Sequence, residues 1–352
     1  MAKYFHSVTL DKDKCRGCTN CIKHCPTEAI RVRNGKATII NERCIDCGEC
    51  IKVCPYHAKQ AVTDPFSTIF EYPYKVAIPA PSLYGQFNRS FSRDRILQGL
   101  LDLGFDWVFE VSQAAEIVSD ATRQLLAAGG LKKPVISSAC PAVVRLIQVR
   151  FPNLIPNILK IESPMELAAR IAKNTVSRDR GIPPEDIGVF FISPCAAKVT
   201  SVKAPYEKKE SSVNGVLAMK DIHIPLMEKM KKIPADIESD LVRSGFDGVG
   251  WARSGGESYA LRNEQYLAVH GIHNVIKILE EIVEERLDGV EFVECLSCTE
   301  GCLGGPLTVE NPFVARTNLK WQIKKAKQEN FSSENSSNDY QDLLWTEDVE
   351  YK

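Results

Sequence analysis

The chain has 352 residues, enough for two or three compact modules and too many for one small disulfide-stapled domain. Hydrophobic residues make up 44% and charged residues 25%, which is typical of a globular protein rather than a disordered or fibrous one. The net charge of -1 gives no global electrostatic reason to expect nucleic acid or a membrane as a partner. The N-terminus lacks an apolar secretory signal and no run reaches roughly 18 apolar residues, so we expect a cytoplasmic protein.

Eight of the 13 cysteines form two runs near the N-terminus, each reading C-x2-C-x2-C-x3-C-P. Cytosolic thiols stay reduced, so metal ligation is favoured over disulfides. Each run places three thiolates around one face of an iron-sulfur cubane, and its fourth cysteine ligates the neighbouring cluster. Structural zinc knuckles are disfavoured, because zinc sites pair two shorter units. The pattern predicts two 4Fe-4S clusters, one held by Cys15, Cys18, Cys21 and Cys54 and the other by Cys44, Cys47, Cys50 and Cys25.

The two cysteine runs are separated by IRVRNGKATII, whose alternation and central Asn34-Gly35 predict a β-hairpin. Residues 1–64 therefore resemble a bacterial two-cluster ferredoxin, an α+β module. A closely spaced pair of clusters suits the transfer of single electrons between a partner at the surface and a deeper site. The rest of the chain is expected to contain that deeper site.

From Lys75 onward, short apolar runs alternate with stretches of helical periodicity. The predicted order is strand KVAIPAPS, helix RILQGLLDLGF, strand WVFEVS, helix AAEIVSDATRQLLAAGG, strand PVISSAC and helix VVRLIQVRF, with later strands in GVFFISPC and GVEFVECLSC. This alternation indicates an α/β domain over residues 75–320, with a parallel or mixed sheet flanked by helices.

Three of these predicted strands run directly into a cysteine, and ligand sites form at the carboxyl ends of strands in such sheets. We therefore expect sulfur from Cys140, Cys195 and Cys298, with Cys302 nearby, at one sheet edge. A scattered cysteine is more often a small buried hydrophobe than a ligand. Here, however, neighbouring prolines and the Gly-rich CTEGCLGGP stretch provide the rigid turns and close backbone approach that a large inorganic cofactor needs.

The segments SSACPAVVR, ISPCAAKVTSVK and VECLSCTEGCLGGP resemble the three signature loops of the catalytic domain of iron-iron hydrogenases. The resemblance implies an H-cluster, in which a 4Fe-4S cubane is bridged to a di-iron unit carrying carbon monoxide, cyanide and an azadithiolate. Its cubane ligands would be Cys140, Cys195, Cys298 and Cys302, with Cys302 as the bridge. Lys198 matches the lysine that donates to one cyanide, and Ser82 matches the hydroxyl near the other. Both residue types satisfy buried anionic ligands.

The departures from the catalytic pattern concern protons. Ala139 stands where a cysteine delivers protons to the azadithiolate, and Thr122 and Leu125 stand where two glutamates continue the path. Three further cofactor-contacting positions are changed: Ser193 and Leu296 replace methionines, and Met165 replaces a glutamine. This pattern resembles the sensory branches of the family and predicts slow turnover, because a positioned acid-base group contributes about 10²–10⁴-fold.

Glu257, Glu294 and Cys295 are the candidates for a substitute proton relay. Each also has a purely structural interpretation. Glu257 follows two glycines at a predicted helix start and could cap that helix. Glu294 could be a solvated or paired carboxylate at a strand end, and Cys295 could serve packing alone.

Two functions remain open. The first is reversible splitting of H₂ into protons and electrons at an H-cluster, coupled through the two 4Fe-4S clusters to a redox protein such as a ferredoxin or to a signalling partner. The second is an electron-transfer or iron-sulfur assembly protein that keeps a four-cysteine cubane and has no di-iron unit. A third interpretation is a subunit of a larger redox complex.

Residues 329–352 are acidic and rich in Ser and Asn, which predicts a flexible tail. Within this tail, DYQDLLW is unusually apolar. It is a candidate for a short docking motif, either for a partner or for the chain's own surface.

Overall fold

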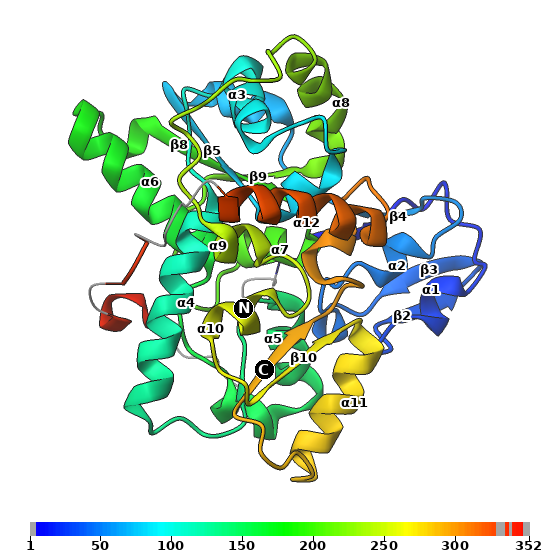
Figure 1. Cartoon of the computed structure of the whole chain (residues 1–352). Helices are drawn as coiled ribbons and strands as arrows, with labels where there is room; N and C mark the ends of the chain where they lie inside the picture. Colours follow the sequence, from blue (N-terminus) through cyan, green and yellow to red (C-terminus); the bar gives the residue numbers. More distant parts are fainter. Residues whose placement is uncertain (1–4, 329–334, 338–339, 348–352) are drawn as a thin grey trace.

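The structure is a computed structural model that describes residues 5–328, 335–337 and 340–347 (Figure 1). It has an N-terminal α+β module, at the blue end of the colour range, followed by an α/β domain built on two parallel sheets. This confirms the predicted fold class. Among the described residues, no helix is both long and apolar enough to cross a membrane.

The N-terminal module consists of two antiparallel strand pairs and two short helices. The predicted hairpin is confirmed, because β2 (Ile30–Arg33) pairs with β3 (Lys36–Ile39) in antiparallel register. Asn34 and Gly35 both have positive φ, 51° and 71°, as the favoured two-residue hairpin turn requires. The other elements are β1 (Val8–Leu10), which pairs with β4 (Lys59–Ala61), and the helices α1 (Asn20–Lys23) and α2 (Glu49–Lys52).

The first sheet of the α/β domain has four parallel strands in the order β6-β5-β8-β9. All seven residues of β8 are buried, which explains its continuously apolar sequence. The strands are β5 (Tyr74–Pro79), β6 (Trp107–Val108), β8 (Ile187–Ser193) and β9 (Gly215–Ala218), and the associated helices are α3 (Arg93–Leu103), α4 (Val111–Ala128), α6 (Pro164–Arg180), α7 (Ala196–Lys203) and α8 (Met219–Met230).

The second sheet has three parallel strands in the order β10-β11-β7. Its strands are β7 (Val135–Ile136), β10 (Tyr266–His270) and β11 (Phe292–Leu296), and beside it lie α5 (Pro141–Arg150), α10 (Gly256–Leu261) and α11 (Ile272–Val283). The remaining helices, α9 (Phe246–Gly250) and α12 (Pro312–Gln328), pack against each other. The expectation of a single sheet edge was therefore wrong. Cys195 follows a strand of the first sheet, whereas Cys140 and Cys298 follow strands of the second.

The N-terminal module packs on the cysteine-bearing loops of the α/β domain. The Ser7 hydroxyl donates to the Ala196 carbonyl over 2.7 Å, directly after Cys195. A Cβ added to Gly48 would lie 2.5 Å from Pro306 Cγ, so the two loops approach too closely for a side chain at that position. The module is thus fixed beside the loops that carry the domain's cysteines.

The apolar motif near the C-terminus lies on the chain's own surface. Leu343 is buried, the Leu343 carbonyl accepts from Glu162 N over 2.6 Å, and Trp345 Nε1 donates to the Ile161 carbonyl over 2.6 Å. The ring of Trp345 also contacts Tyr206 edge-on. Residues 340–347 therefore depart from the expected flexible tail, because three apolar side chains provide enough contact to hold them. Residues 329–334, 338–339 and 348–352 of that tail lie outside the described part.

Candidate cluster-binding site

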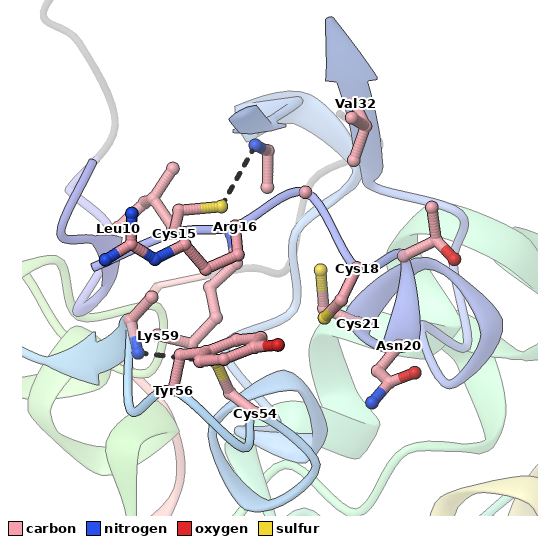
Figure 2. A pocket seen from close by; sticks show the side chains of 14 residues that line it. Leu10, Cys15, Arg16, Cys18, Asn20, Cys21, Val32, Cys54, Tyr56 and Lys59 are labelled. Atoms are coloured by element: carbon pink, nitrogen blue, oxygen red, sulfur yellow. Dashed lines mark hydrogen bonds between the residues drawn. The ribbon is translucent and has the colours of Figure 1, made fainter. Parts of the chain in front are cut away.

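The first cavity of the N-terminal module is lined by the four cysteines that the sequence assigns to one cluster, Cys15, Cys18, Cys21 and Cys54. Figure 2 shows their sulfur atoms around a common space, with Tyr56 and Lys59 also at its border. Cys18 is exposed, so this cavity reaches the surface. The loops from the two cysteine runs thus meet as the repeat predicts.

The second cavity is lined by the other predicted set, Cys25, Cys44, Cys47 and Cys50. Cys44 and Cys50 are buried. Ile45 and Cys47 belong to the same apolar cluster as Cys140 and Cys195 of the α/β domain. The second cavity therefore lies between the first cavity and the cysteine loops of that domain.

The chemistry of both cavities fits 4Fe-4S clusters. Backbone N–H groups donate to three of the sulfur atoms: Ala37 to Cys15, Ala29 to Cys25 and Ala58 to Cys54, over 3.4, 3.2 and 3.3 Å. Such bonds stabilise thiolates and tune cluster potentials. Burial raises the pKa of Cys50 to about 12, so in the absence of iron its thiol stays protonated. A bound metal provides the positive charge that deprotonates buried thiols of this kind.

The four cysteines of the α/β domain converge although they come from two different sheets. Burial, together with the neighbouring Cys298 and Cys140, raises the pKa of Cys195 to about 12. The pKa of the buried Cys302 is raised in the same way, with Cys195, Cys140 and Cys298 as its thiol neighbours. Four mutually interacting buried thiols fit a third cubane.

The third cysteine loop is held in place by α12. Arg316 Nη1 donates to both carboxylate oxygens of Glu300, over 2.9 and 2.8 Å, and Glu300 lies between Cys298 and Cys302. Glu300 has a positive φ of 58°, a backbone conformation that a firm side-chain anchor helps to maintain. The ion pair thus fixes the turn that presents both sulfur atoms.

Close contacts with the protein backbone explain the two adjacent glycines after Cys302, Gly304 and Gly305. A Cβ on Gly305 would lie 2.1 Å from the Pro194 carbonyl oxygen, and one on Gly304 would lie 2.3 Å from the Thr299 carbonyl oxygen. The second and third cysteine loops therefore approach backbone to backbone. These glycines cannot be counted as a sign of a bulky cofactor, contrary to our interpretation of the sequence.

Lys198 and Ser82 lie near the Cys302 loop. Lys198 is on α7, and its charge lowers the pKa of Cys195 and of Cys302. Ser82 is fully buried in the 3-10 helix η3 (Pro81–Gln86), which packs on η6 (Gly301–Gly304), the segment that contains Cys302. The Ser82 hydroxyl contacts the sulfur of Met219 at 3.9 Å, a neighbour that the sequence did not reveal.

The replaced positions have local structural roles. Ser193 Oγ accepts from Cys195 N over 3.0 Å and so shapes the second loop. Thr122 Oγ1 donates to the Val118 carbonyl of its own helix, while Met165 and Leu296 are buried among apolar side chains. Leu125 packs against the main core. None of these side chains offers an ionisable group for proton transfer.

Beside Ala139, the structure places a buried hydroxyl and a carboxylate in contact. Ser137 Oγ accepts from Ala139 N over 3.2 Å and donates to Glu257 Oε2 over 2.7 Å. Burial and the neighbouring Glu294 carboxylate raise the pKa of Glu257 to about 8. Glu257 does not cap α10, so that interpretation was wrong. Ser137 belongs to the sequence motif around Ala139, but the motif did not reveal its contact with Glu257.

Glu294 and Cys295 are neighbours of Glu257 and are fully buried. Glu294 accepts from the backbone N–H groups of Gly255 and Ser258 and from the Ser258 hydroxyl, over 2.8 to 2.9 Å. Burial nevertheless raises the pKa of Glu294. Cys295 is an apolar core residue whose pKa is also raised by burial. Glu294 is therefore both a structural anchor for the start of α10 and an electrostatic neighbour of Glu257.

Another buried carboxylate, Glu207, was missed by the sequence analysis. It accepts from Ser163 N over 2.8 Å and from Ser163 Oγ over 3.0 Å, at the start of the helix that contains Met165. Burial, together with the Glu166 carboxylate, raises the pKa of Glu207 to about 7. It lies in a Lys-rich stretch, KAPYEKK, so nothing in the local sequence marks it as buried.

Comparison with known proteins agrees with this division of the chain. The model of the iron-only hydrogenase large subunit, C-terminal domain, matches residues 74–262 and 256–306, and that of a 4Fe-4S dicluster domain matches residues 7–55. Iron hydrogenase 1 of Clostridium pasteurianum is 26% identical over an alignment 372 residues long, gaps included. The alignment covers 85% of this chain and 64% of that protein.

The chain is also similar in sequence to an assembly factor and in structure to a solved hydrogenase. The cytosolic Fe-S cluster assembly factor nar1 of Aspergillus fumigatus is 31% identical over 103 residues, covering 27% of this chain and 17% of that protein. A solved variant of FeFe-hydrogenase HydA1 from Chlamydomonas reinhardtii superposes with a TM-score of 0.61 at 14% identity, covering 82% of this chain and 97% of that chain. At this identity the superposition shows the fold alone. By its matched domain, the chain belongs to the iron-only hydrogenase family and carries an N-terminal 4Fe-4S dicluster module.

Proposed function

We propose that this protein reacts reversibly with H₂ at an H-cluster, slowly, and exchanges the electrons through two 4Fe-4S clusters. The observation that carries the proposal is the position of Lys198, whose charge acts on the buried thiols of Cys195 and Cys302. A cation at the bridging cysteine is the partner that a cyanide-bearing unit requires. Cys140, Cys195, Cys298 and Cys302 would hold the cubane.

The chain's own residues supply binding and proton transfer. When bound, the di-iron unit supplies the metal at which H₂ becomes two protons and two electrons. Lys198 and Ser82 orient it through hydrogen bonds to its anionic ligands. Protons move between Ser137 and Glu257, whose contact at 2.7 Å and pKa of about 8 suit transfer near neutral pH. Turnover is slow because the first position of the relay is Ala139, whose side chain carries no exchangeable proton.

Clusters held in the second and first cavities would carry electrons between the third cubane and the surface, where Cys18 is exposed. The partner is a redox protein such as a ferredoxin, or a signalling protein. All 13 cysteines are free, which fits a reducing compartment such as the cytoplasm. The absence of a proton-relay cysteine favours a sensory or regulatory role over bulk hydrogen production.

The second candidate is an electron-transfer or iron-sulfur assembly protein with no di-iron unit. The similarity to nar1, a cytosolic Fe-S cluster assembly factor, supports this candidate, although it extends over only 103 residues. The replacement of the expected relay residues and the structural explanation of Gly304 and Gly305 also fit this candidate. It keeps the cubane ligands and predicts no reaction with H₂.

The two candidates separate in a hydrogen-oxidation assay on anaerobically purified protein matured with a synthetic di-iron precursor. We expect H₂-dependent reduction of a viologen dye, and a loss of about 10²-fold in Lys198→Met, because one buried donor to an anionic ligand is removed. Lys203→Met is the matched control, because Lys203 ends the same helix with its ammonium paired to Asp64. No dye reduction by the wild type, together with cluster transfer to an apo-ferredoxin, would favour the assembly function.

A further inference from the structure

The N-terminal module buries one lysine ammonium without a partner. Lys59 begins β4, faces Leu10 in the β1-β4 ladder and is only 2% exposed. Its Nζ makes no hydrogen bond with any of the described residues, and no carboxylate among them forms an ion pair with it. Lys59 is also one of the residues that line the first cysteine cavity (Figure 2).

An isolated buried ammonium is costly, since a low-dielectric interior does not replace its hydration. The position is therefore sensible only if an anion lies beside it. The groups on which the Lys59 charge acts are the thiols of Cys15 and Cys21 in the first cavity and of Cys50 in the second. The unpartnered charge thus lies between the two sets of cluster ligands.

We propose that Lys59 is a fixed positive charge shared by the two clusters of the module, and that it raises the reduction potential of both. A cubane bound by four thiolates is anionic, and it becomes more negative by one charge when it accepts one electron. A nearby cation stabilises the reduced form more than the oxidised form. No proton is exchanged in this step, and Lys59 keeps its charge throughout.

Lys52 provides the contrast within the module. Its charge acts on Cys47 of the second cavity and on Cys298 of the α/β domain, so it lies at the next junction of the electron path. The Lys52 ammonium is, however, paired with Glu49 over 2.9 Å. The net field at that junction is therefore weaker than the field of the unpaired Lys59. This difference favours electron flow outward, from the cubane toward the surface, as hydrogen uptake requires.

The test is a redox titration, monitored by electron paramagnetic resonance, on the full chain loaded with its 4Fe-4S clusters and without a di-iron unit. We expect lower potentials for both module clusters in Lys59→Met, so that the ratio of reduced to oxidised cluster at a fixed potential falls about tenfold, which is 59 mV for one electron. Lys59→Arg keeps the charge and should resemble the wild type. Lys23→Met removes an exposed charge at the end of α1 and should change little.

The inference rests on the cluster-binding part of the proposed function and not on hydrogen chemistry, so the two can fail separately. Full cluster content with unchanged potentials in Lys59→Met would overturn it, as would an equal shift in Lys59→Arg. If the methionine variant loses its clusters, Lys59→Gln takes its place in the comparison. Loss of clusters in both neutral variants but not in the arginine variant would support a pairing between the Lys59 charge and the anionic clusters. Loss of clusters in all three variants would overturn the proposal.

Discussion

The N-terminal module and the α/β domain both gather cysteines around a buried space, but they do so over different distances. The module takes its eight cysteines from one short stretch, Cys15 to Cys54, in which two copies of a motif fold against each other. The domain takes four from Cys140 to Cys302, on loops after strands of two separate sheets. Local spacing therefore specifies the first arrangement, whereas only the complete fold specifies the second.

The two regions also differ in what they retain. Every cysteine of the repeated motif lines a cavity in the module. In the domain the buried cysteines and Lys198 remain, while Ala139, Thr122 and Leu125 leave no titratable group in the expected proton path. The proposed function therefore depends on two separable properties, electron transfer through the module and proton transfer in the domain. The predictions below separate these two properties, from the largest expected effect to the smallest.

The largest effect should come from Cys195→Ser. We expect loss of the third cubane alone, about four irons per chain, because Cys195 is a proposed ligand of that cubane only, and the eight cysteines that line the module's cavities are unchanged. Iron analysis and electron paramagnetic resonance would measure this loss, and reaction with H₂ should disappear with it. Cys295→Ser is the control, since Cys295 is a buried thiol that packs in the core. Loss of all three clusters in Cys195→Ser would show that the two regions do not assemble separately.

Glu257→Gln should slow turnover without altering the clusters. Because the amide cannot carry the proton exchanged with Ser137, we expect a loss of about 10²-fold in hydrogen oxidation. The rate of the wild type should change with pH near 8, the pKa of Glu257, and the variant should lose that dependence. Steady-state rates between pH 6 and 9 measure both effects.

Ser137→Ala and Ala139→Cys complete that experiment. The alanine variant should be as slow as Glu257→Gln, because Ser137 is the contact between Ala139 and the carboxylate. Ala139→Cys restores a thiol at the position of the family's proton donor and should raise the rate. A wild-type rate in both Glu257→Gln and Ser137→Ala would remove these residues from the proton path.

Glu207 should make folding stability depend on pH. Its pKa is about 7 in the folded protein against 4.5 in the unfolded chain, so the folded state holds the extra proton between these values. The free energy of unfolding should therefore fall as pH rises through this window, by about 3 kcal/mol, and level off above pH 7. Denaturant unfolding at pH 5 and pH 8 tests this. Glu207→Gln should show a smaller difference, and an identical one would contradict the assignment.

The smallest effect concerns the C-terminal segment. Trp345→Phe removes the hydrogen bond to the Ile161 carbonyl but keeps an aromatic ring near Tyr206. We expect a loss of about 1 kcal/mol in the free energy of unfolding. Thermal unfolding of matched samples would measure it, with the exposed Lys23→Met as a neutral control. No change in stability would indicate that the Trp345 hydrogen bond contributes little to holding residues 340–347.

The sequence predicted those features that depend on local chemistry. The turn at Asn34 and Gly35, the pairing of the cysteine sets in the module and the alternation of strands and helices all follow from spacing and backbone preference. The division into two sheets did not follow, because strand pairing joins segments far apart in the chain. Gly304 and Gly305 were misinterpreted because only the folded chain shows which carbonyl groups exclude a side chain there. The Thr299 carbonyl of the same loop faces Gly304, and the Pro194 carbonyl of the second cysteine loop faces Gly305.

Buried charges were the least predictable part of the site. Glu207 and Lys59 stand among polar neighbours in the sequence, and only the folded chain shows that both are buried. Glu257 was singled out as a relay candidate, but its partner Ser137 lies 120 positions away. Such groups are identified by what surrounds them in space, so a sequence pattern does not distinguish them from surface residues.

The central claim, a di-iron site that reacts with H₂, is tested most directly by infrared spectroscopy in the range of metal-bound carbon monoxide and cyanide. The sample is the full chain, purified anaerobically and matured with a synthetic di-iron precursor. We predict bands from both ligands that shift when argon is replaced by hydrogen. Absence of these bands, with iron sufficient for three cubanes only, would contradict the claim and leave the electron-transfer or assembly function in its place.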